Sequence, residues 1–279
     1  MASTNELIMK KTRLDQLLID KNLVDNRSEA QRLIRAGKVL IREEVVDKPG
    51  IKFSDEYPIR IITPKCPFVG RGGLKMDAAL KQFAIDPTGL IAADLGASTG
   101  GFTDCLLQNG IEKVYAIDVG HGQLAYSLQI DKRVIVMDKT NCRHLTAQDL
   151  GETVDIIVAD LCFIGIRTVF PAIKRLLKEN GFALLLIKPQ FEIGKGRVGK
   201  KGIVRKSEDH IEVLQQFLEF FQKENWSVAG VIPSPITGKS GNIEFLLHAT
   251  PKPINGGVTI EDIQTIASNA HNKAGKNNG

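Results

Sequence analysis

An acidic residue followed by a run of small residues marks the most chemically informative segment of this chain. The apolar run 90–93 ends in Asp94, and the loop that follows is rich in small side chains: Gly96, Ala97, Ser98, Thr99, Gly100 and Gly101. Phe102 then begins a stretch with apolar residues at helical spacing, which predicts a strand, a tight loop and a helix. Glycines in such a loop allow the backbone to approach a ligand closely. The segment therefore predicts a nucleotide-binding corner of an open α/β sheet.

The spacing of the glycines distinguishes between nucleotide ligands. A dinucleotide site is typical of G-x-G-x-x-G, whereas three residues separate Gly96 from Gly100 here. Asp94 would repel a pyrophosphate, but its carboxylate can pair with an ammonium group. S-adenosylmethionine carries an amino acid, a sulfonium and an adenosine without phosphate, so the loop favours a methyltransferase. A dehydrogenase and a turn that binds no ligand remain as alternatives.

Polar residues end five consecutive predicted strands, and this pattern predicts a single crevice. They are Asp94, Asp118, Asp138, Asp160 and Lys188. Ligands of open α/β sheets bind at the carboxyl ends of the strands, where Asp118 is placed to meet ribose hydroxyls. A buried lysine needs a partner, so Lys188 is expected to pair with Asp160. The pair is either a structural ion pair or a lysine that handles a proton beside the methyl donor.

The residues after the fourth strand distinguish between methyl acceptors. Amino-group methyltransferases carry an acid or amide followed by two prolines and an aromatic residue, and enzymes that methylate cytosine carbon carry a cysteine preceded by proline. This chain has Asp160-Leu161-Cys162-Phe163, without a proline. We therefore expect Cys162 to be a small residue packed near the ligand. A hydroxyl group is the acceptor that remains.

The elements that must position these residues alternate along the chain. Strands are predicted at 90–94, 113–117, 133–137, 154–159, 182–187, 227–232 and 243–248. Helices are predicted at 101–109, 121–129, 165–179 and 207–224. Such alternation predicts an α/β fold with a parallel sheet that has helices on both faces.

A smaller α+β unit precedes this sheet. Thr12 and Ser28 are predicted to cap two helices, Gly37 ends the second helix, and short strands follow at 39–42, 44–47 and 59–63. Pro64 and Pro67 bracket a linker. We expect four parts: a small domain at 1–63, a linker at 64–70, the α/β domain at 71–250, and a tail at 251–279 with room for a short helix.

Composition limits the classes of function. The 279 residues are 43% hydrophobic and carry a formal charge of +5, which suits a folded protein with an anionic partner. The four cysteines form no C-x-x-C pair, so we expect no metal site and a reducing cytoplasmic location. The first residues lack the apolar core of a signal peptide, and no apolar run approaches the roughly 20 residues that cross a bilayer.

The N-terminal unit resembles the αL RNA-binding domain of a small-subunit ribosomal protein, bacterial tyrosyl-tRNA synthetases and pseudouridine synthases. Its arrangement of two short helices, then A-G-K-V-L-I-R and a small sheet, carries this resemblance. The resemblance implies that Arg32, Arg35 and Lys38 contact RNA phosphates. Alternatively, these charges form an ordinary solvated face.

The chain between residue 12 and about 248 resembles the TlyA family, formerly called haemolysins and now regarded as ribosomal RNA 2′-O-methyltransferases. The motifs R-G-G-L-K, D-L-G-A-S-T-G-G-F-T-D, D-V-G-x-G-Q-L, D-L-x-F-I, K-P-Q-F-E and S-G-N-x-E carry this resemblance. The α/β half also resembles the Rossmann-like FtsJ-type ribose methyltransferases with their Lys-Asp-Lys-Glu tetrad. The motifs place that tetrad on Lys75, Asp160, Lys188 and Glu244. One departure is Cys162, where the family usually has serine.

This resemblance implies S-adenosylmethionine-dependent methylation of a ribose 2′-hydroxyl, with cytidine in structured ribosomal RNA as the expected target. In this interpretation Asp160 and Glu244 hold Lys188, which acts on the hydroxyl proton or orients its lone pair. Lys75 is expected to help hold the hydroxyl in line. The expected cofactor contacts are Asp94, Gly96, Ala97, Ser98, Thr99, Gly100, Gly101, Phe102, Asp118, Val119, Gln123, Asp138 and Asp160. The expected RNA contacts are Arg13, Arg32, Arg35, Lys38, Arg71, Lys195, Arg197, Lys200 and Lys201. The alternatives are a membrane-active lysin and an inactive RNA-binding assembly factor.

Overall fold

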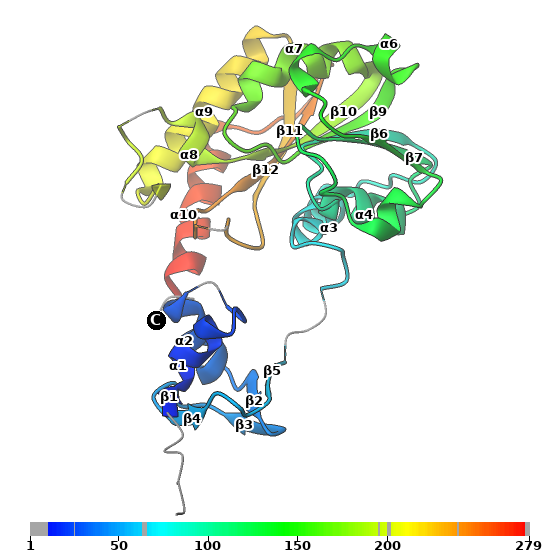
Figure 1. Ribbon diagram of the computed structural model, residues 1–279. Helices are drawn as coiled ribbons and strands as arrows, with labels where there is room; N and C mark the ends of the chain where they lie inside the picture. The colour runs from blue at the N-terminus through cyan, green and yellow to red at the C-terminus, as the bar shows by residue number, and fades with distance from the viewer. Residues whose placement is uncertain are drawn as a thin grey trace, which may run out of the picture. The chain divides into compact units, whose positions relative to one another are not determined.

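The computed structural model describes residues 11–24, 26–62, 66–194, 196–199, 202–238 and 240–276. The chain forms two compact units, Met1–Cys66 and Pro67–Gly279 (Figure 1). Each unit has its own hydrophobic core.

The N-terminal unit combines two short helices with short antiparallel strands. Its elements are β1 (Lys11–Arg13), α1 (Leu14–Asp20), α2 (Arg27–Arg35), β2 (Val39–Ile41), β3 (Glu44–Val46), β4 (Lys52–Ser54) and β5 (Ile59–Ile61). Strand β2 lies between β3 and β5, and β1 pairs with β4. Apolar side chains from both helices and from β2 form the core, among them Leu14, Leu18, Ile34 and Val39.

Both predicted helix caps in this unit are wrong. Thr12 lies in β1, and α1 begins at Leu14 without a side-chain cap. Helix α2 is capped by Asn26, whose side chain accepts a hydrogen bond from the Glu29 backbone N–H at 3.0 Å, and not by Ser28. Asn26 and Ser28 are both good capping residues, so only the backbone conformation, which is extended at Asn26, decides between them.

The C-terminal unit contains the large sheet. Its strands are β6 (Ile91–Leu95), β7 (Lys113–Ile117), β8 (Val134–Met137), β9 (Val154–Ala159), β10 (Leu177–Ile187), β11 (Ser227–Pro233) and β12 (Phe245–Thr250). Its helices are α3 (Gly72–Gln82), α4 (Gly101–Gln108), α5 (Tyr126–Gln129), α6 (Ala147–Leu150), α7 (Ile166–Leu176), α8 (Pro189–Glu192), α9 (Ser207–Lys223) and α10 (Ile260–Lys276), with a 3-10 turn at Cys142–His144.

The strand order is β11-β12-β10-β9-β6-β7-β8. The chain runs from β6 outward to β8 and returns to the other side of β6 as β9, which makes the β6–β9 boundary a topological switch point. The expectation of a wholly parallel sheet is wrong for one strand, because β12 is antiparallel to both β10 and β11. The start of β12 therefore lies at the same edge of the sheet as the carboxyl ends of the other strands.

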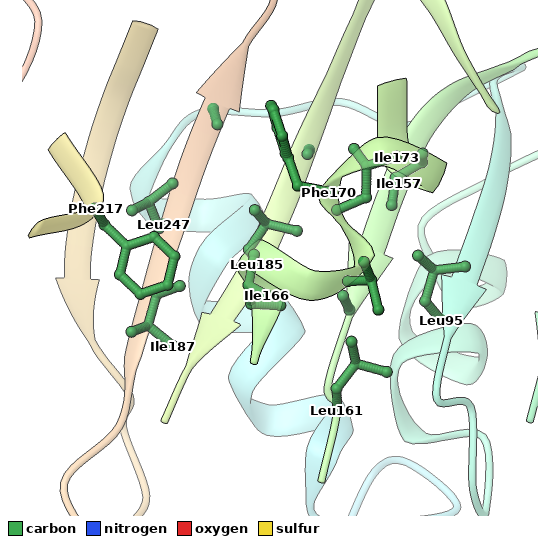
Figure 2. Close-up of a cluster of buried hydrophobic side chains, with 14 of the residues drawn as sticks. Leu95, Ile157, Leu161, Ile166, Phe170, Ile173, Leu185, Ile187, Phe217 and Leu247 are labelled. Carbon is green, nitrogen blue, oxygen red and sulfur yellow. The ribbon is translucent and has the colours of Figure 1, made fainter. Parts of the chain in front are cut away.

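Two apolar layers enclose this sheet. Helices α3, α4 and α5 pack on one face, where Met76, Phe102 and Leu106 lie against alternate strand residues. Helices α7, α9 and α10 pack on the other, where Phe170 and Phe217 are fully buried (Figures 1 and 2). Successive residues of each strand point to opposite faces of the sheet. Because helices cover both faces, the strands are continuous apolar runs rather than alternating apolar and polar residues.

Two helices differ in length from their predictions. Helix α5 covers only Tyr126–Gln129 instead of 121–129, because Gly122 has a positive φ of 65° and its N–H bonds to Asp138. The C-terminal helix is longer than the short one expected, since α10 has 17 residues and buries Ile263 and Ala267 in the core of the sheet domain. Residues 67–279 accordingly form one compact unit.

Candidate active site

Four charged residues from four different elements meet at one edge of the sheet. Lys75 comes from α3, Asp160 follows β9, Lys188 follows β10, and Glu244 precedes β12. The Nζ of Lys75 lies 2.7 Å from Oε2 of Glu244 and 3.4 Å from Oδ2 of Asp160. The Nζ of Lys188 lies 2.5 Å from Oδ1 of Asp160. The structure thus brings the four predicted tetrad residues into one cluster.

The partners within the cluster differ from those expected. Glu244 bonds to Lys75 rather than to Lys188, so the order of contacts is Lys188, Asp160, Lys75, Glu244. Glu244 is 3% exposed, and a Cβ atom at Gly238 would lie only 2.5 Å from its Oε1. The loop before β12 therefore packs directly on the Glu244 carboxylate, which is why a glycine suits position 238.

Two opposing effects act on Lys188, which is 7% exposed. Burial disfavours its charge, but the Asp160 carboxylate and the Cys162 sulfur outweigh burial, so the pKa of Lys188 is raised. Lys188 is consequently an ammonium at neutral pH in this arrangement. The two lysines and two acids balance in charge, which is a requirement for burying such a cluster.

The segment after Asp160 is more open than predicted. Cys162 is exposed rather than packed, and its Sγ lies 3.1 Å from Nζ of Lys188. Phe163 has a positive φ of 64° and is 91% exposed, and its ring lies 5.6 Å from that of Phe191. A bulky residue in this backbone conformation is unusual and is often associated with function.

Asp94 lies at the base of the loop after β6 and is 1% exposed. Its Oδ2 accepts hydrogen bonds from the N–H and hydroxyl of Thr103 on α4, at 3.1 and 2.7 Å. Its Oδ1 is buried without a hydrogen-bond partner among the described residues. Burial raises the pKa of Asp94 to about 7, although the Thr103 bonds oppose this shift. Thr103 itself was not predicted, and its only signal was a hydroxyl placed in the first turn of the helix.

The glycines of this loop are constrained mainly by the protein itself. Gly96 and Gly100 have φ values of 86° and 91°. A Cβ at Gly96 would lie 2.9 Å from the Asp160 carbonyl oxygen, and one at Gly100 would lie 2.2 Å from Leu128. A Cβ at Gly101 would lie 2.8 Å from the Gly73 nitrogen. The close approach that these glycines permit is between segments of the chain, so a larger residue would disturb folding as well as ligand binding.

The next two strand ends carry acids that organise loops. Asp118 accepts hydrogen bonds from the N–H groups of Ser98 and Gly120 at 2.8 and 2.7 Å. Asp138 accepts one from the Gly122 N–H at 2.8 Å, and this bond, followed by His121, holds the pKa of Asp138 below its usual range. Val119 between them is 70% exposed, which leaves an apolar surface beside these acids.

The remaining predicted cofactor residues fall into two groups. Ser98, Thr99 and Gln123 are exposed, and the Ser98 hydroxyl contacts Gln123 at 3.3 Å. Ala97 and Phe102 are buried in the core against α3 and α5. Phe102 therefore stabilises the helix that follows the loop.

The predicted RNA contacts are not equally available. Arg13 and Arg27 both bind the buried Asp15, and the hydrogen bond from Arg13 holds the pKa of Asp15 well below its usual range. Arg197 is paired with Asp209 and Glu212 of α9. Arg35 is exposed, and Arg32 is exposed with Glu29 at 3.9 Å.

The other five predicted contacts lie elsewhere. Lys38 is half-buried after α2, and Arg71 is exposed with Nη2 3.3 Å from the Thr237 carbonyl oxygen. Lys195, Lys200 and Lys201 lie outside the described residues.

Two further observations concern other classes of function. Among the described residues, no group of three or more His, Cys, Asp or Glu side chains is arranged to hold a metal ion. Within the same part of the chain, none of the helices combines the length and apolar character needed to span a bilayer.

Comparison with known proteins assigns both units to families. Residues 68–250 match the FtsJ-like methyltransferase family, and residues 12–56 match the S4 domain. YqxC of Bacillus subtilis, which is named as an rRNA methyltransferase, is 45% identical over 86% of this chain and 85% of that protein. The 16S/23S rRNA (cytidine-2′-O)-methyltransferase TlyA of Mycobacterium tuberculosis is 41% identical over 85% of this chain and 89% of its own length.

A solved structure extends the likeness to both units. A protein from Streptococcus thermophilus that is named as a hemolysin has a TM-score of 0.78 and 39% identity, and the match covers 96% of this chain and 98% of the other. These matches confirm the α/β methyltransferase fold and the N-terminal RNA-binding domain that the motifs predict. The chain belongs to the TlyA family of FtsJ-like methyltransferases with an N-terminal S4 domain.

Proposed function

We propose that this protein transfers the methyl group of S-adenosylmethionine to the 2′-hydroxyl of a cytidine in ribosomal RNA. The observation that carries the proposal is the cluster of Lys75, Asp160, Lys188 and Glu244, in which Asp160 is half-buried and the other three are buried, beside the loop at the switch point of the sheet. The M. tuberculosis relative is named for this reaction on cytidine.

The loop after β6 fits the donor. The unpartnered Oδ1 of Asp94 is a buried acceptor that suits an ammonium group, and Asp118 can accept a ribose hydroxyl in addition to its two backbone N–H groups. Val119 offers an exposed apolar surface for an adenine ring. The donor supplies an activated methyl group on its sulfonium.

Lys188 is placed to orient the acceptor hydroxyl. An ammonium has three N–H donors, and those of Lys188 face two acceptors within the described residues, Asp160 and Cys162. The third can hold the 2′-oxygen with a lone pair directed at the methyl group. Because its pKa is raised, Lys188 suits this orienting role better than a proton-accepting one. Asp160 is then the nearest acceptor for the hydroxyl proton.

Lys75 has a different role from the one expected. Its ammonium joins the carboxylates of Asp160 and Glu244, so it sets the position of Asp160 and offsets its charge. Positioning of this kind supplies much of the rate in a reaction whose leaving group is already activated. Lys75, like Glu244, thus acts on the hydroxyl through Asp160.

The N-terminal unit supplies the RNA-binding surface in this proposal. Arg32 and Arg35 are exposed in the last turn of α2, where phosphates can reach them. Ribosomal subunits are the proposed partners, and the cytoplasm is the proposed location.

The test is methyl transfer from labelled donor to ribosomal subunits, with the product mapped as ribose methylation. Lys188→Ala should lower turnover by on the order of a hundredfold or more. Lys178→Ala is the control, because Lys178 of β10 forms an ion pair with Asp155 of β9, and this pair is more exposed and lies at the opposite edge of the sheet. Equal turnover in the two variants would refute the role of Lys188, and donor binding without any transfer would indicate an RNA-binding protein instead.

A further inference from the structure

The loop between β9 and α7 is held against one short segment at three points. At its start, Asp160 bonds to Lys188 at 2.5 Å. In its middle, the Phe163 ring lies 5.6 Å from that of Phe191. At its end, the Ile166 N–H donates to Oε1 of Glu192 at 2.8 Å. Residues 188–192 therefore contact the start, the middle and the end of this loop.

Two apolar side chains of the same loop region are also buried in the hydrophobic core. Leu161 and Ile166, which are 8% and 2% exposed, both lie in the cluster under α7 (Figure 2). Between these anchors, Cys162 and Phe163 are exposed. The two ends of the loop are thus held in the core, whereas its central residues are exposed. One of these central residues, Cys162, contacts Lys188 of the proposed reaction site.

Glu192 acts as the missing cap of α7. The N-cap residue of this helix is Gly165, which has no side chain to offer, and the first turn of α7 contains no acid. A helix N-terminus leaves N–H groups unpaired and favours a negative charge. The Glu192 carboxylate, which comes from α8, supplies both a hydrogen-bond acceptor and a negative charge at this helix N-terminus. It also lies close to Gly165, where a Cβ would be only 3.0 Å from Oε2 of Glu192.

We propose that Glu192 is a positioning residue for methyl transfer, which acts by fixing the loop that carries Asp160, Cys162 and Phe163. This inference rests on the proposed function. Phe163 keeps a backbone conformation that is costly for a bulky residue, and such a conformation persists only where the surroundings impose it. Without Glu192, the Ile166 N–H loses its acceptor and the end of the loop is free to relax. RNA use should suffer, whereas the donor loop after β6 has no contact with Glu192 among the described residues.

The experiment compares full-length Glu192→Ala, Glu192→Gln and Asp149→Ala with the parent. Asp149→Ala is the matched control, because Asp149 completes the capping box of α6 at the opposite edge of the sheet, just before β9. Three quantities are measured: kcat/KM for ribosomal subunits, donor affinity by calorimetry, and amide hydrogen exchange of peptides covering 160–168. Exchange requires no methyl transfer, so it tests the loop even if the RNA substrate is different.

Glu192→Ala should lower kcat/KM by on the order of tenfold to a hundredfold. Donor affinity should fall less than kcat/KM, because Glu192 itself has no contact with Asp94 or its loop among the described residues. Exchange at 160–168 should become faster. Glu192→Gln should restore most of each loss, because a glutamine oxygen can accept the same N–H bond but lacks the negative charge. Asp149→Ala should leave them unchanged.

The outcomes separate this inference from the proposed function. An active parent with Glu192→Ala at the same kcat/KM and the same exchange would overturn the inference. An equal loss in Asp149→Ala would overturn it too, since general destabilisation would then explain both. An inactive parent would refute the proposed function alone. If Glu192→Ala does not fold, Gly165→Ala perturbs the same contact from the other side, at a φ of −77° that alanine accepts.

Discussion

Donor binding should strengthen as pH rises through neutrality, because of Asp94. This carboxyl is buried, burial raises its pKa to about 7, and its Oδ1 lacks a partner. An ammonium group placed at Oδ1 would favour the ionised carboxylate, so binding would lower the pKa of Asp94 and release a proton. The ionised form binds the donor, and the protonated form must first lose its proton.

The size of the effect follows from the fraction of Asp94 that is ionised. With a pKa of about 7, roughly a tenth of the free protein is ionised at about pH 6 and roughly nine tenths at about pH 8. The apparent Kd should therefore fall about tenfold across this range. The direction of the change in Kd follows from the raised pKa of Asp94. If the pKa of Asp94 were lowered instead, the carboxyl would be ionised throughout this range and Kd would stay constant.

Calorimetric titration with S-adenosylmethionine at several pH values measures this change. Titration in buffers with different ionisation enthalpies counts the released protons. Asp94→Asn provides the control: the amide can still accept from Thr103 but does not titrate, so its Kd should be weaker and independent of pH. A parent Kd that is constant between about pH 6 and pH 8, without proton release, would refute the placement of the donor ammonium at Asp94.

Three further predictions concern other parts of the chain. Gly100→Val should lower the midpoint of thermal unfolding as well as donor affinity, because the valine side chain would collide with Leu128. The strain costs about 1–3 kcal/mol or more. An unchanged midpoint in a thermal scan would contradict this packing. Cys162→Ser should keep most of its methyl transfer, because an oxygen acceptor needs no thiol, and complete loss in a folded variant would indicate base methylation. Replacing Arg32, Arg35 and Lys38 with alanine should weaken rRNA binding and lower its salt dependence by roughly one unit of slope per lost phosphate contact. Binding that matches the parent across a salt series would show that these charges are only a solvated face.

The sheet strands are predictable from the sequence because their apolar runs are long and end in polar residues. Six of the predicted strands begin within two residues of the observed ones, and β10 begins earlier because Leu177 pairs with Val154 before a register shift. The direction of β12 was not predictable in this way, since an apolar run has no signal for parallel or antiparallel pairing. The direction of pairing depends on which strands lie on either side of β12 in the folded sheet.

The grouping of Lys75, Asp160, Lys188 and Glu244 at one edge of the sheet agrees with the motifs, but which of these side chains contact one another was not predictable. Which lysine holds Glu244 depends on the position of α3 above the sheet edge, and no local pattern encodes that position. The same limit applies to Phe163, whose positive φ follows from its surroundings rather than from its own preference. Helix α10, in contrast, could have been found, since Ile263, Ala267 and Ala270 repeat at helical spacing and line its buried face.

The direction and place of β12 have a consequence for the newly made chain. Strand β12 inserts between β10 and β11, so the sheet stays divided until residues 245–250 have been synthesised. Glu244 enters the cluster only with that insertion, and Lys75 lacks one of its two carboxylates before it. Because long-range strand pairing forms late in folding, catalytic competence should appear last. A nascent chain would carry its RNA-binding domain before it could methylate anything.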